Sequence, residues 1–530
     1  GRCKLHQPSP HLPPRMESPG RFPHHQQPPE KMKVNIAKYD RICGNRLFPL
    51  TFVVLAFLFI LLFSYSTSPL FAIETGDSSV FKMMGHVLLN GGVPYVDYFD
   101  HKGPYLYLIN AIGESISPTW GLFPLQVLCM SLSLWLWYKT ARLFVRPTYA
   151  FGIVLLTMVS FLGVYENGNL SEEWSLLPCS LCVYLSLSYL VNCPSERHRY
   201  WRSLLYGLCF GFVFLIRPND AVMICGGVMT GIFLYIVIRQ KQYVSALVNA
   251  LTFFLGAAVM AAPWIAYFAT HNALSAFYFG LIGFNIDYNE GVLYNLMFIY
   301  RNKKLLFICL ISIGLIITAK KQNLLWIAIP ITLFTILLFG RKNYPHYYII
   351  ITPSIILLYA SMLFCQRNKM LIAIFAILPF IIFPYMNDGV REIKRTAKQI
   401  VTGGIGQHLN GLKIDVSEAK HLLSFVPEEE RDSIWNYGDY FSSYFHHCGI
   451  TAQNSVPPVI AQYRQPFPEE MQKQQDLISK KPLWIFKENK KYLFPEDSAF
   501  ICEHYSLAKE SEYSSFQLLK RKKTNKISEK

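Results

Sequence analysis

Charged residues are scarce in this sequence. Asp, Glu, Lys and Arg make up only 16% of its 530 residues, whereas soluble proteins carry roughly a quarter, and 52% of the residues are hydrophobic. Such an apolar excess needs an apolar solvent, which excludes an ordinary cytosolic enzyme. The sequence also lacks a glycine-rich loop of the P-loop or dinucleotide-binding type, so nothing in it indicates a nucleotide-sugar site.

The first segment, residues 1–31, is rich in Pro, His and Gln and has too few apolar residues to bury a core. It does not begin with Met, and Met16 or Met32 is a candidate start. We therefore interpret residues 1–31 as a disordered tail or a non-native extension and leave them out of the fold.

Long uncharged runs dominate residues 32–386. The first, Leu47–Ser66, has about 20 residues, the length of helix that crosses roughly 30 Å of hydrocarbon, and it has no small-residue cleavage site. Similar segments follow at 120–138, 147–164, 174–192, 203–216, 221–238, 247–267, 305–319, 323–340, 347–364 and 370–386. The sequence therefore predicts an α-helical polytopic membrane protein with about eleven transmembrane helices.

Basic residues predict the orientation of these helices. If the N-terminus is cytoplasmic, every inner loop carries Lys or Arg, for example Arg142, Arg197 and Lys320, as the positive-inside rule requires. An odd number of spans then places residues 387–530 outside. Short helical patterns alternate there with short apolar runs such as LWIFKE (483–488), so we expect a small extracytoplasmic α/β domain. Its two cysteines, Cys448 and Cys502, are a disulfide candidate in an oxidising compartment, or free buried thiols.

Acidic residues collect on the predicted outer side. Of the 12 between Leu47 and Met386, only Glu196 falls on the inner side, and acidic residues contribute little to topology. The outer side also carries eight basic residues that break the positive-inside rule; for one of them, Lys82, snorkelling to lipid head groups is a sufficient explanation. Carboxylates and cations mixed at the outer boundary of an apolar bundle indicate chemistry on a lipid-linked phosphate. The net charge of +16 therefore needs no nucleic acid as a partner.

The first outer loop, residues 67–119, has the densest pattern. A short amphipathic helix, Val80–Leu89, is followed by Gly91 and Gly92, which turn the chain toward Asp97 and Asp100. A second acidic site, Glu172 and Glu173 in ENGNLSEEW, lies one helical hairpin later. Two carboxylates from separate loops can divide labour, because one can take a proton from an attacking hydroxyl while the other holds a metal or the acceptor.

Five segments carry a resemblance: ETGD (74–77), GGVPYVDYFDHKGPYLY (91–107), NLSEEW (169–174), RPND (217–220) and YPHYYIIITP (344–353). Over about residues 47–386 the chain resembles membrane glycosyltransferases of the GT-C fold, within it the bacterial protein-mannosyltransferase-like and RgtA/B/C/D-like branch. The resemblance implies a polyprenyl-phosphate sugar donor, an extracytoplasmic active site and an acidic base in the first outer loop, a position that Asp77 matches. The second acidic position of the fold would fall on Glu172 or Glu173. The C-terminal domain is not explained by the resemblance.

We therefore expect an inverting sugar transfer to an envelope glycan, lipid or protein at the outer face of a bacterial cytoplasmic membrane. Asp77 would act as the base. Glu172 or Glu173 would orient the acceptor, or with Asp77 bind a divalent cation such as Mg²⁺ or Mn²⁺. The donor phosphate would lie near cations that neutralise its charge as the glycosidic bond breaks, namely Lys102, Arg217, Arg341, Lys342 and His346. The residues with acceptor-binding or structural roles are Asp97, Asp100, His101 and Glu290.

Two other classes stay open at this point. A transporter or flippase for lipid-linked sugars would also have many spans, but should place charged residues at mid-bilayer in repeated halves. The acidic residues here lie in loops, and no internal repeat is clear. A polysaccharide polymerase or ligase would also use outer arginines and a polyprenyl donor, yet would not need a carboxylate-rich first loop.

Overall fold

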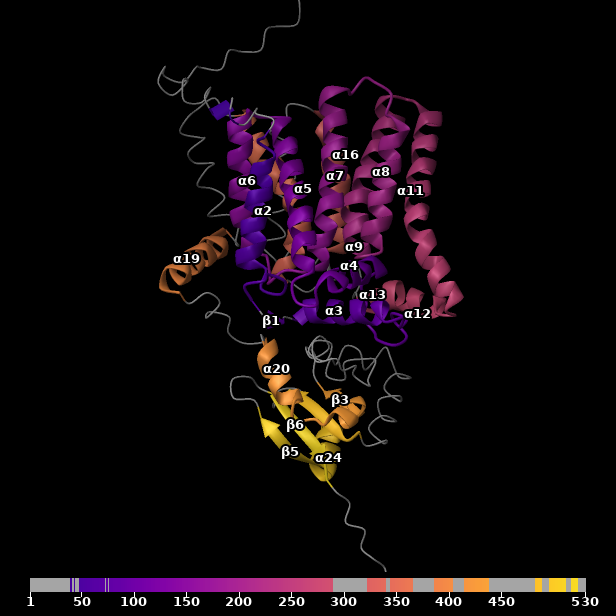
Figure 1. Cartoon of the computed structure of the whole chain (residues 1–530). Coiled ribbons are helices and arrows are strands. Elements are labelled where there is room, and N and C mark those ends of the chain that lie inside the picture. Colours follow the sequence, from indigo (N-terminus) through magenta and orange to yellow (C-terminus); the bar gives the residue numbers. More distant parts are fainter. Residues whose placement is uncertain are drawn as a thin grey trace, which may run out of the picture.

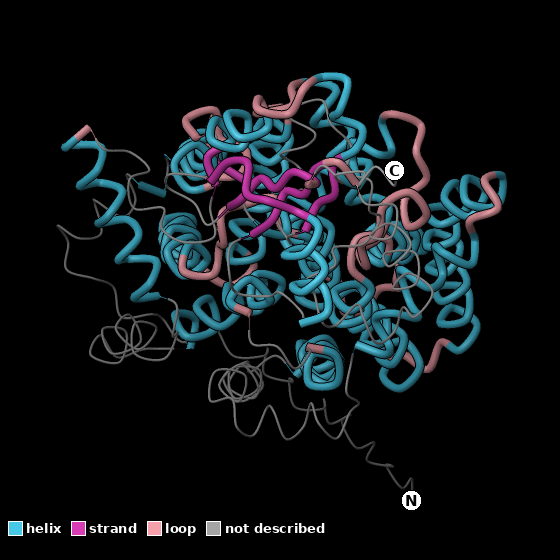
Figure 2. Tube along the Cα trace, turned by 90° about the horizontal axis from the view of Figure 1, so that it is seen from below, coloured by secondary structure: helices cyan, strands magenta, loops and turns pink. Residues whose placement is uncertain are grey.

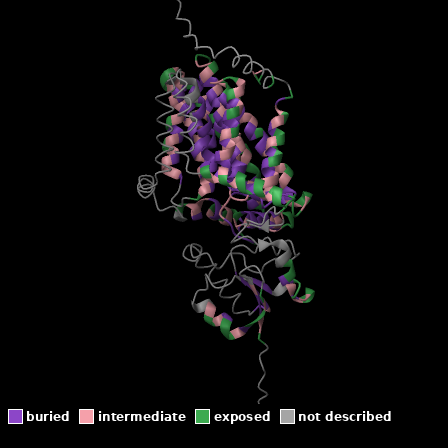
Figure 3. Ribbon diagram, turned by 90° about the vertical axis from the view of Figure 1, so that its left-hand side faces the viewer, coloured by how far each residue is buried: buried purple, intermediate pink, exposed green. Residues whose placement is uncertain are grey.

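The uncharged runs become a bundle of helices that lie side by side in the computed structural model (Figure 1). This structure describes residues 39–40, 42, 47–71, 73–74, 76–288, 322–339, 344–365, 386–403, 414–437, 482–488, 495–510 and 516–522. Buried residues lie along the bundle helices, as the purple ribbon in Figure 3 shows. The hydrophobic core therefore runs along the length of the bundle.

The bundle contains α2 (Leu50–Phe63), α5 (Leu122–Arg142), α6 (Pro147–Leu162), α7 (Ser171–Asn192), α8 (Tyr200–Phe214), α11 (Tyr243–Thr270), α16 (Leu325–Leu338), the 3₁₀-helix η5 (Pro345–Ile351) with its continuation α17 (Thr352–Cys365), and one long segment made of α9 (Pro218–Asp220), η1 (Ala221–Gly226), α10 (Gly227–Leu234) and η2 (Tyr235–Arg239). The short 3₁₀-helix η4 (Gln322–Leu324) precedes α16.

Among the described residues, three helices are long and apolar enough to cross a membrane: Ser171–Asn192, Pro218–Arg239 and Tyr243–Thr270. Shorter apolar helices accompany them, such as Leu50–Phe63 and Pro147–Leu162. Every predicted span lies on one of the bundle helices except 305–319 and 370–386, which fall outside the described residues apart from Met386. The predicted fold class, an α-helical polytopic membrane protein, is confirmed.

Glycine allows the closest helix pair, α8 and α11, to approach. A Cβ at Gly207 would clash with the backbone oxygen of Phe253, and a Cβ at Gly256 would lie 2.5 Å from that of Leu204. Small residues at such crossings let two backbones pack closely, which favours helix association in a membrane.

Short helices lie across one end of the bundle (Figure 1). They come from two loops of the predicted outer side: α3 (Gly76–Leu89), α4 (Pro104–Ile116), α12 (Leu274–Tyr278), η3 (Phe279–Gly283) and α13 (Phe284–Tyr288). The predicted amphipathic helix is therefore present as α3, but it begins four residues earlier, so that Asp77 lies in its first turn. It ends before Gly91, whose φ of 80° suits a residue without a Cβ.

Loops predicted to be inner meet at the opposite end. The Glu196 carbonyl accepts a hydrogen bond from Gln240 at 3.0 Å, and Arg197 donates to Ser245 at 3.3 Å. The two sets of loops are thus separated by the length of the bundle, as the charge pattern predicts.

The C-terminal part forms a four-stranded mixed sheet with strand order β3-β4-β6-β5. Strands β3 and β4 are parallel, and the other two pairings are antiparallel. Its elements are α19 (Met386–Thr402), β2 (Ile414–Asp415), α20 (Val416–Leu423), η6 (Glu428–Ser433), β3 (Ile434–Tyr437), β4 (Trp484–Glu488), α24 (Pro495–His504), β5 (Tyr505–Glu510) and β6 (Phe516–Arg521). The apolar run predicted at 483–488 is β4, and the α/β character predicted for this part is confirmed.

The sheet lies beyond the short helices, at the same end of the bundle (Figures 1 and 2). A separate two-stranded sheet joins the C-terminal part of the chain to the first outer loop, because β1 (Ile73–Glu74) pairs antiparallel with β2, Ile73 opposite Asp415. Helix α19 contacts α6, so the first part of the segment 387–530 lies against the bundle.

Candidate active site

Charged residues from three distant segments meet at the end of the bundle where the short helices lie. Glu172 lies in the first turn of α7, Arg217 precedes α9, and His346 lies in η5. Glu172 Oε1 is 2.6 Å from Arg217 Nη1 and 3.9 Å from His346 Nε2, and all three side chains are largely buried. Three of the predicted site residues are thereby in one cluster.

Arg217 is held by two carboxylates. Its Nη1 also lies 3.0 Å from Asp220 Oδ1, and its guanidinium stacks 4.1 Å above the Tyr347 ring. Pro218 begins the helix directly after Arg217, which brings Asp220 back onto the arginine one turn later. Burial opposes the charged guanidinium, but the charges of Asp220 and Glu172 outweigh it and raise the pKa of Arg217 above its ordinary value.

His346 lies between two glutamates. Its Nδ1 is 2.6 Å from Oε2 of Glu166, a half-exposed residue, and its ring stacks on Tyr344 with an interplanar angle of 9°. Burial lowers the pKa of His346, but the carboxylates of Glu172 and Glu166 outweigh burial and raise it above the usual value. Glu166 was not among the predicted site residues. It is the first acidic residue of ENGNLSEEW, so the same acidic segment was the signal that could have identified it.

Glu173 points elsewhere. Its carboxylate accepts hydrogen bonds from Gln126 at 2.9 and 3.1 Å, Tyr165 at 2.8 Å and the Asn169 backbone at 2.9 Å. Successive side chains on a helix point about 100° apart, which separates Glu173 from the charged cluster that Glu172 faces. Glu173 joins α5 to the start of α7 through this buried network.

Asp77 lies at the rim of the cluster. Its side chain is exposed in the first turn of α3, where the helix dipole favours a carboxylate. Burial raises the pKa of Tyr344, whose ring stacks on His346, and the charges of Asp77 and Glu166 raise it further.

Lys102 is positioned by its backbone. Its carbonyl accepts hydrogen bonds from Tyr95 at 2.6 Å and Tyr107 at 2.7 Å, and its Nζ lies 2.7 Å from His101 Nε2. The His101 ring packs against Phe284 of α13, with ring centroids 5.2 Å apart. Helix α13 therefore braces the segment that carries Lys102.

Close backbone packing joins Lys102 to Arg217. The Gly103 N–H donates to the Ile216 carbonyl at 2.9 Å, and a Cβ at Gly103 would clash with the Leu215 backbone. Glycine at this position allows the two loops to lie against each other. Two predicted phosphate-binding residues, 115 positions apart in the sequence, are thus held on adjoining backbone.

Asp100 is buried beside Lys102. It lies 3.2 Å from the Tyr107 hydroxyl and 3.4 Å from His101 Nδ1. Burial raises the pKa of Asp100, and the charge of Asp77 adds to this, although Lys102 and the His101 backbone act in the opposite direction. Asp97 is exposed instead, and its carboxylate accepts a hydrogen bond from the Val93 N–H at 2.6 Å. Asp97 thus stabilises a turn.

Four predicted residues, Glu290, Arg341, Lys342 and Cys448, lie outside the described residues. Cys502, the candidate disulfide partner of Cys448, is a free and exposed thiol on α24.

The predicted divalent cation is not tested by the described side chains. In this part of the chain no group of three or more His, Cys, Asp or Glu residues is arranged to hold a metal ion. The Glu172 carboxylate is already paired with Arg217. We therefore assign no chemical step to a metal.

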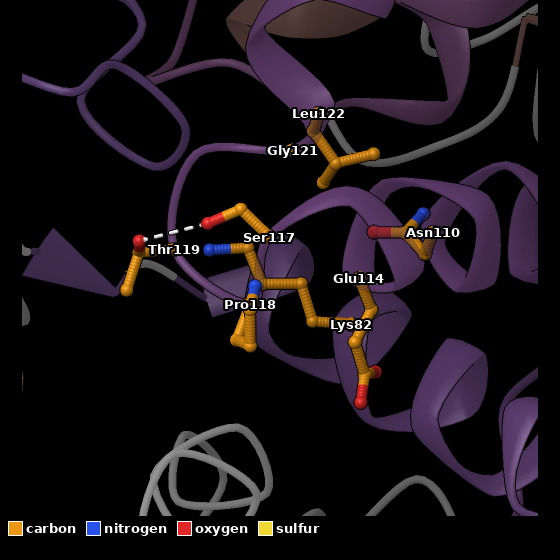
Figure 4. Close-up of a pocket in the computed structure, with 8 residues that line it drawn as sticks. All are labelled: Lys82, Asn110, Glu114, Ser117, Pro118, Thr119, Gly121 and Leu122. Carbon is orange, nitrogen blue, oxygen red and sulfur yellow. Dashed lines mark hydrogen bonds between the residues drawn. The ribbon is translucent and has the colours of Figure 1, made fainter.

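A small pocket lies in the first outer loop, between α3, α4 and the start of α5 (Figure 4). It is lined by Lys82, Asn110, Glu114, Ser117, Pro118, Thr119, Gly121 and Leu122, and by no member of the charged cluster. Lys82 is itself buried and donates to the Ser66 carbonyl at 2.7 Å, so the interpretation that it snorkels to lipid head groups is wrong. Its ammonium instead donates a hydrogen bond to a backbone carbonyl in the turn that follows α2.

Comparison with known proteins gives a family match to part of the bundle. Residues 101–267 match the family model of dolichyl-phosphate-mannose-protein mannosyltransferases. The matched region includes Lys102, Glu172 and Arg217. A comparison with curated protein sequences gives no match.

Two solved structures share the fold. ArnT from Cupriavidus metallidurans, solved bound to undecaprenyl phosphate, aligns over 89% of this chain and 97% of its own, with 11% identity and a TM-score of 0.56. The oligosaccharyltransferase AglB from Archaeoglobus fulgidus, in complex with an inhibitory peptide and a dolichol-phosphate, aligns over 83% of this chain and 69% of its own, with 12% identity and a TM-score of 0.51. At such identities the likeness shows the fold alone.

Proposed function

We propose that this chain, a protein-mannosyltransferase-like membrane protein with the GT-C fold, transfers a sugar from a polyprenyl phosphate to an acceptor outside the cytoplasm. The observation that carries the proposal is the charged cluster at the end of an apolar bundle, where Glu172, Arg217 and His346 meet beside Lys102. The polyprenyl phosphates bound to the two solved neighbours support the same class of donor.

Lys102 and His346 are the cations assigned to the donor phosphate. A phosphate gains charge as the glycosidic bond breaks, and cations placed in advance stabilise that charge in the transition state. Arg217 is partly neutralised by Glu172 and Asp220, so we assign it mainly to holding Glu172 and the adjoining Lys102 loop in place. Arg341 and Lys342 remain candidate phosphate ligands.

Asp77 is the base assigned to the acceptor hydroxyl. It is exposed to the outer side at the rim of the cluster, where an acceptor can reach it. Removing the proton as the hydroxyl attacks the anomeric carbon opposite the phosphate would invert the configuration. Asp100 and His101, which lie 3.4 Å apart beside Lys102, would shape the site.

We assign the site to the outer face of a bacterial cytoplasmic membrane, with the N-terminus cytoplasmic. The positive-inside pattern supports this orientation. Strand β2 of the C-terminal segment pairs with β1 of the first outer loop, which supports placing the two segments on one side. The acceptor would be an envelope glycan, lipid or protein.

The test measures sugar transfer from radiolabelled polyprenyl phosphate sugars in membranes that contain wild type, Asp77→Asn or Asp97→Asn. Asp97 is the matched control, because it is an exposed aspartate of the same loop that only stabilises a turn. We expect Asp77→Asn to lower transfer by about 10²- to 10⁴-fold, the usual contribution of a general base, and Asp97→Asn to stay within a few-fold of wild type.

Two outcomes would count against the proposal. Transfer retained by Asp77→Asn would refute the assignment of the base. Absence of transfer by wild type from every donor, together with movement of the lipid-linked sugar across the membrane, would identify a transporter instead.

A further inference from the structure

Helix α19, which follows the last predicted span, is held against the outer ends of two bundle helices. Gly389 packs on the Val159 backbone and lies near Gly163 at the end of α6, where a Cβ would clash. The Tyr65 hydroxyl, just beyond α2, donates to Glu392 Oε1 at 2.7 Å. These contacts place α19 at the level of the predicted outer membrane boundary, and it projects sideways from the bundle (Figure 1).

An apolar stripe runs along α19 beside its protein contacts. Val390, Ile393, Ala397, Ile400 and Val401 recur at intervals of three and four residues and therefore share one face. This face is not covered by the described parts of the chain, because Ile393, Ile400 and Val401 are 41%, 49% and 86% exposed. Residues that pack on the bundle, Gly389 and Thr396, lie along the adjoining side.

Basic residues flank the other edge of this stripe: Arg391, Lys394, Arg395 and Lys398. The helix has only two acidic residues, Asp388 and Glu392, and they pair with Arg391 and Arg395. Lys394 and Lys398 are therefore surplus positive charges, both exposed on the surface. An apolar stripe with a cationic border is typical of helices that lie in the plane of a membrane interface.

We propose that α19 binds the outer surface of the membrane by inserting Ile393, Ile400 and Val401 among lipid chains, while its basic edge contacts anionic lipid phosphates. Around the helix, the apolar stripe lies between the face that contacts the bundle and the basic edge. This order suits a helix that is attached to the bundle on one side and contacts lipid with the stripe. The cationic border selects anionic lipid, because phosphates attract Lys and Arg at the surface. The helix thus forms a lipid-bound junction between the bundle and the C-terminal sheet.

The test measures amide hydrogen exchange of residues 386–402 in the full-length protein. The protein is placed in nanodiscs of phosphatidylcholine alone or of an equal mixture of phosphatidylcholine and phosphatidylglycerol. We expect exchange in α19 to slow by about tenfold or more in the anionic nanodiscs, because lipid contact restricts local opening of the helix. Residues of α24 in the C-terminal sheet domain serve as the internal control and should exchange equally in both.

Two variants separate the contribution of the basic edge from that of the apolar stripe. Arg391→Gln/Lys394→Gln/Arg395→Gln/Lys398→Gln removes the charge but keeps good helix formers, and should abolish the difference between the two lipids. Ile393→Gln/Ile400→Gln/Val401→Gln removes the stripe and should raise exchange in both lipids. Equal exchange of the wild-type helix in both lipids would overturn the proposal. Protection that follows protein concentration rather than lipid charge would also overturn it, because a second copy of the chain would then cover the helix.

Discussion

Glu172 Oε1 lies 2.6 Å from Arg217 Nη1, at a buried junction between α7 and the chain that leaves α8. The pair is shared with Asp220 on one side and His346 on the other. Removing one partner of a buried ion pair leaves a charge uncompensated, which costs about 3–5 kcal/mol in measured cases. The junction therefore stabilises this end of the bundle and also holds the charged side chains of the site in place.

Glu172→Gln should lower both stability and transfer. Asp220 remains to hold Arg217, so we expect the variant to fold with a loss of about 2–3 kcal/mol, less than a fully uncompensated charge costs. Transfer should fall by about 100-fold, because His346 and Arg217, which adjoins the Lys102 loop, both lose the carboxylate that pairs with them. Thermal unfolding in detergent and transfer per folded molecule measure the two effects. Glu428→Gln, at an exposed ion pair, is the control and should change neither.

Glu173→Ala should act on stability alone. It leaves the buried donors of Gln126, Tyr165 and Asn169 without their acceptor, and we expect a loss of about 3 kcal/mol. Transfer normalised to folded protein should stay within a few-fold of wild type. A Glu173→Ala protein that is stable but inactive would show that the site uses this glutamate rather than Glu172.

Glu166→Gln should shift the pH dependence of transfer. Glu166 raises the pKa of His346 together with Glu172, so wild-type transfer should fall as pH rises through the His346 titration. Without the Glu166 carboxylate His346 loses its proton at lower pH, and this fall should move to lower pH. The profile of initial rate against pH measures the shift. An unchanged profile would mean that the charge of His346 is not used.

Gly103→Ala should separate Lys102 from Arg217. The added Cβ meets the Leu215 backbone, which cannot rotate away, so the two loops must move apart. We expect a loss of transfer larger than the loss of stability, because one loop carries the proposed phosphate ligand Lys102 and the other carries Arg217, which holds Glu172 in place. Gly152→Ala on α6 is the matched control. No atom lies within 4 Å of its added Cβ, and alanine should stabilise that helix by about 0.5–1 kcal/mol.

Asp100→Asn should change how stability depends on pH. Burial raises the pKa of Asp100 in the folded protein above its unfolded value, so folding favours the protonated form. This contribution is fully present below the unfolded pKa of about 3.9 and is lost as pH rises through the folded pKa. The melting temperature of Asp100→Asn minus that of wild type should therefore increase with pH across this window. A constant difference would refute the raised pKa.

The bundle could be predicted from the sequence because a single physical requirement, apolar length, decides it. The runs at 147–164 and 247–267 lie on α6 and α11 with only small differences at their ends. The sequence predicts too late a start for α3, because GDSS before Val80 has no apolar period although it belongs to the helix. The sequence predicts that residues of the surface helix α19 belong to the outer domain, because most of them are polar. A polar composition does not indicate the contact that this helix makes with α6.

The sequence predicts several charged residues of the site, but not which of them form ion pairs with one another. Glu172, Arg217 and His346 were identified as charges on one side of the membrane. The sequence could not decide between Glu172 and Glu173, because their side chains diverge only when α7 begins at Ser171. The sequence also could not show that Arg217 forms ion pairs with Asp220 and Glu172. The pair with Glu172 depends on how α7 packs against α8.

The pairing of β1 with β2 bears on the order in which the protein is made. Ile73 leaves the ribosome more than three hundred residues before Asp415, its partner on the neighbouring strand. In the proposed orientation, the loop that carries Asp77 would cross the membrane long before β2 is synthesised. Its backbone pairing with β2 can form only after residues 414–415 have been made. A chain interrupted before β2 would therefore lack this pairing on the first outer loop.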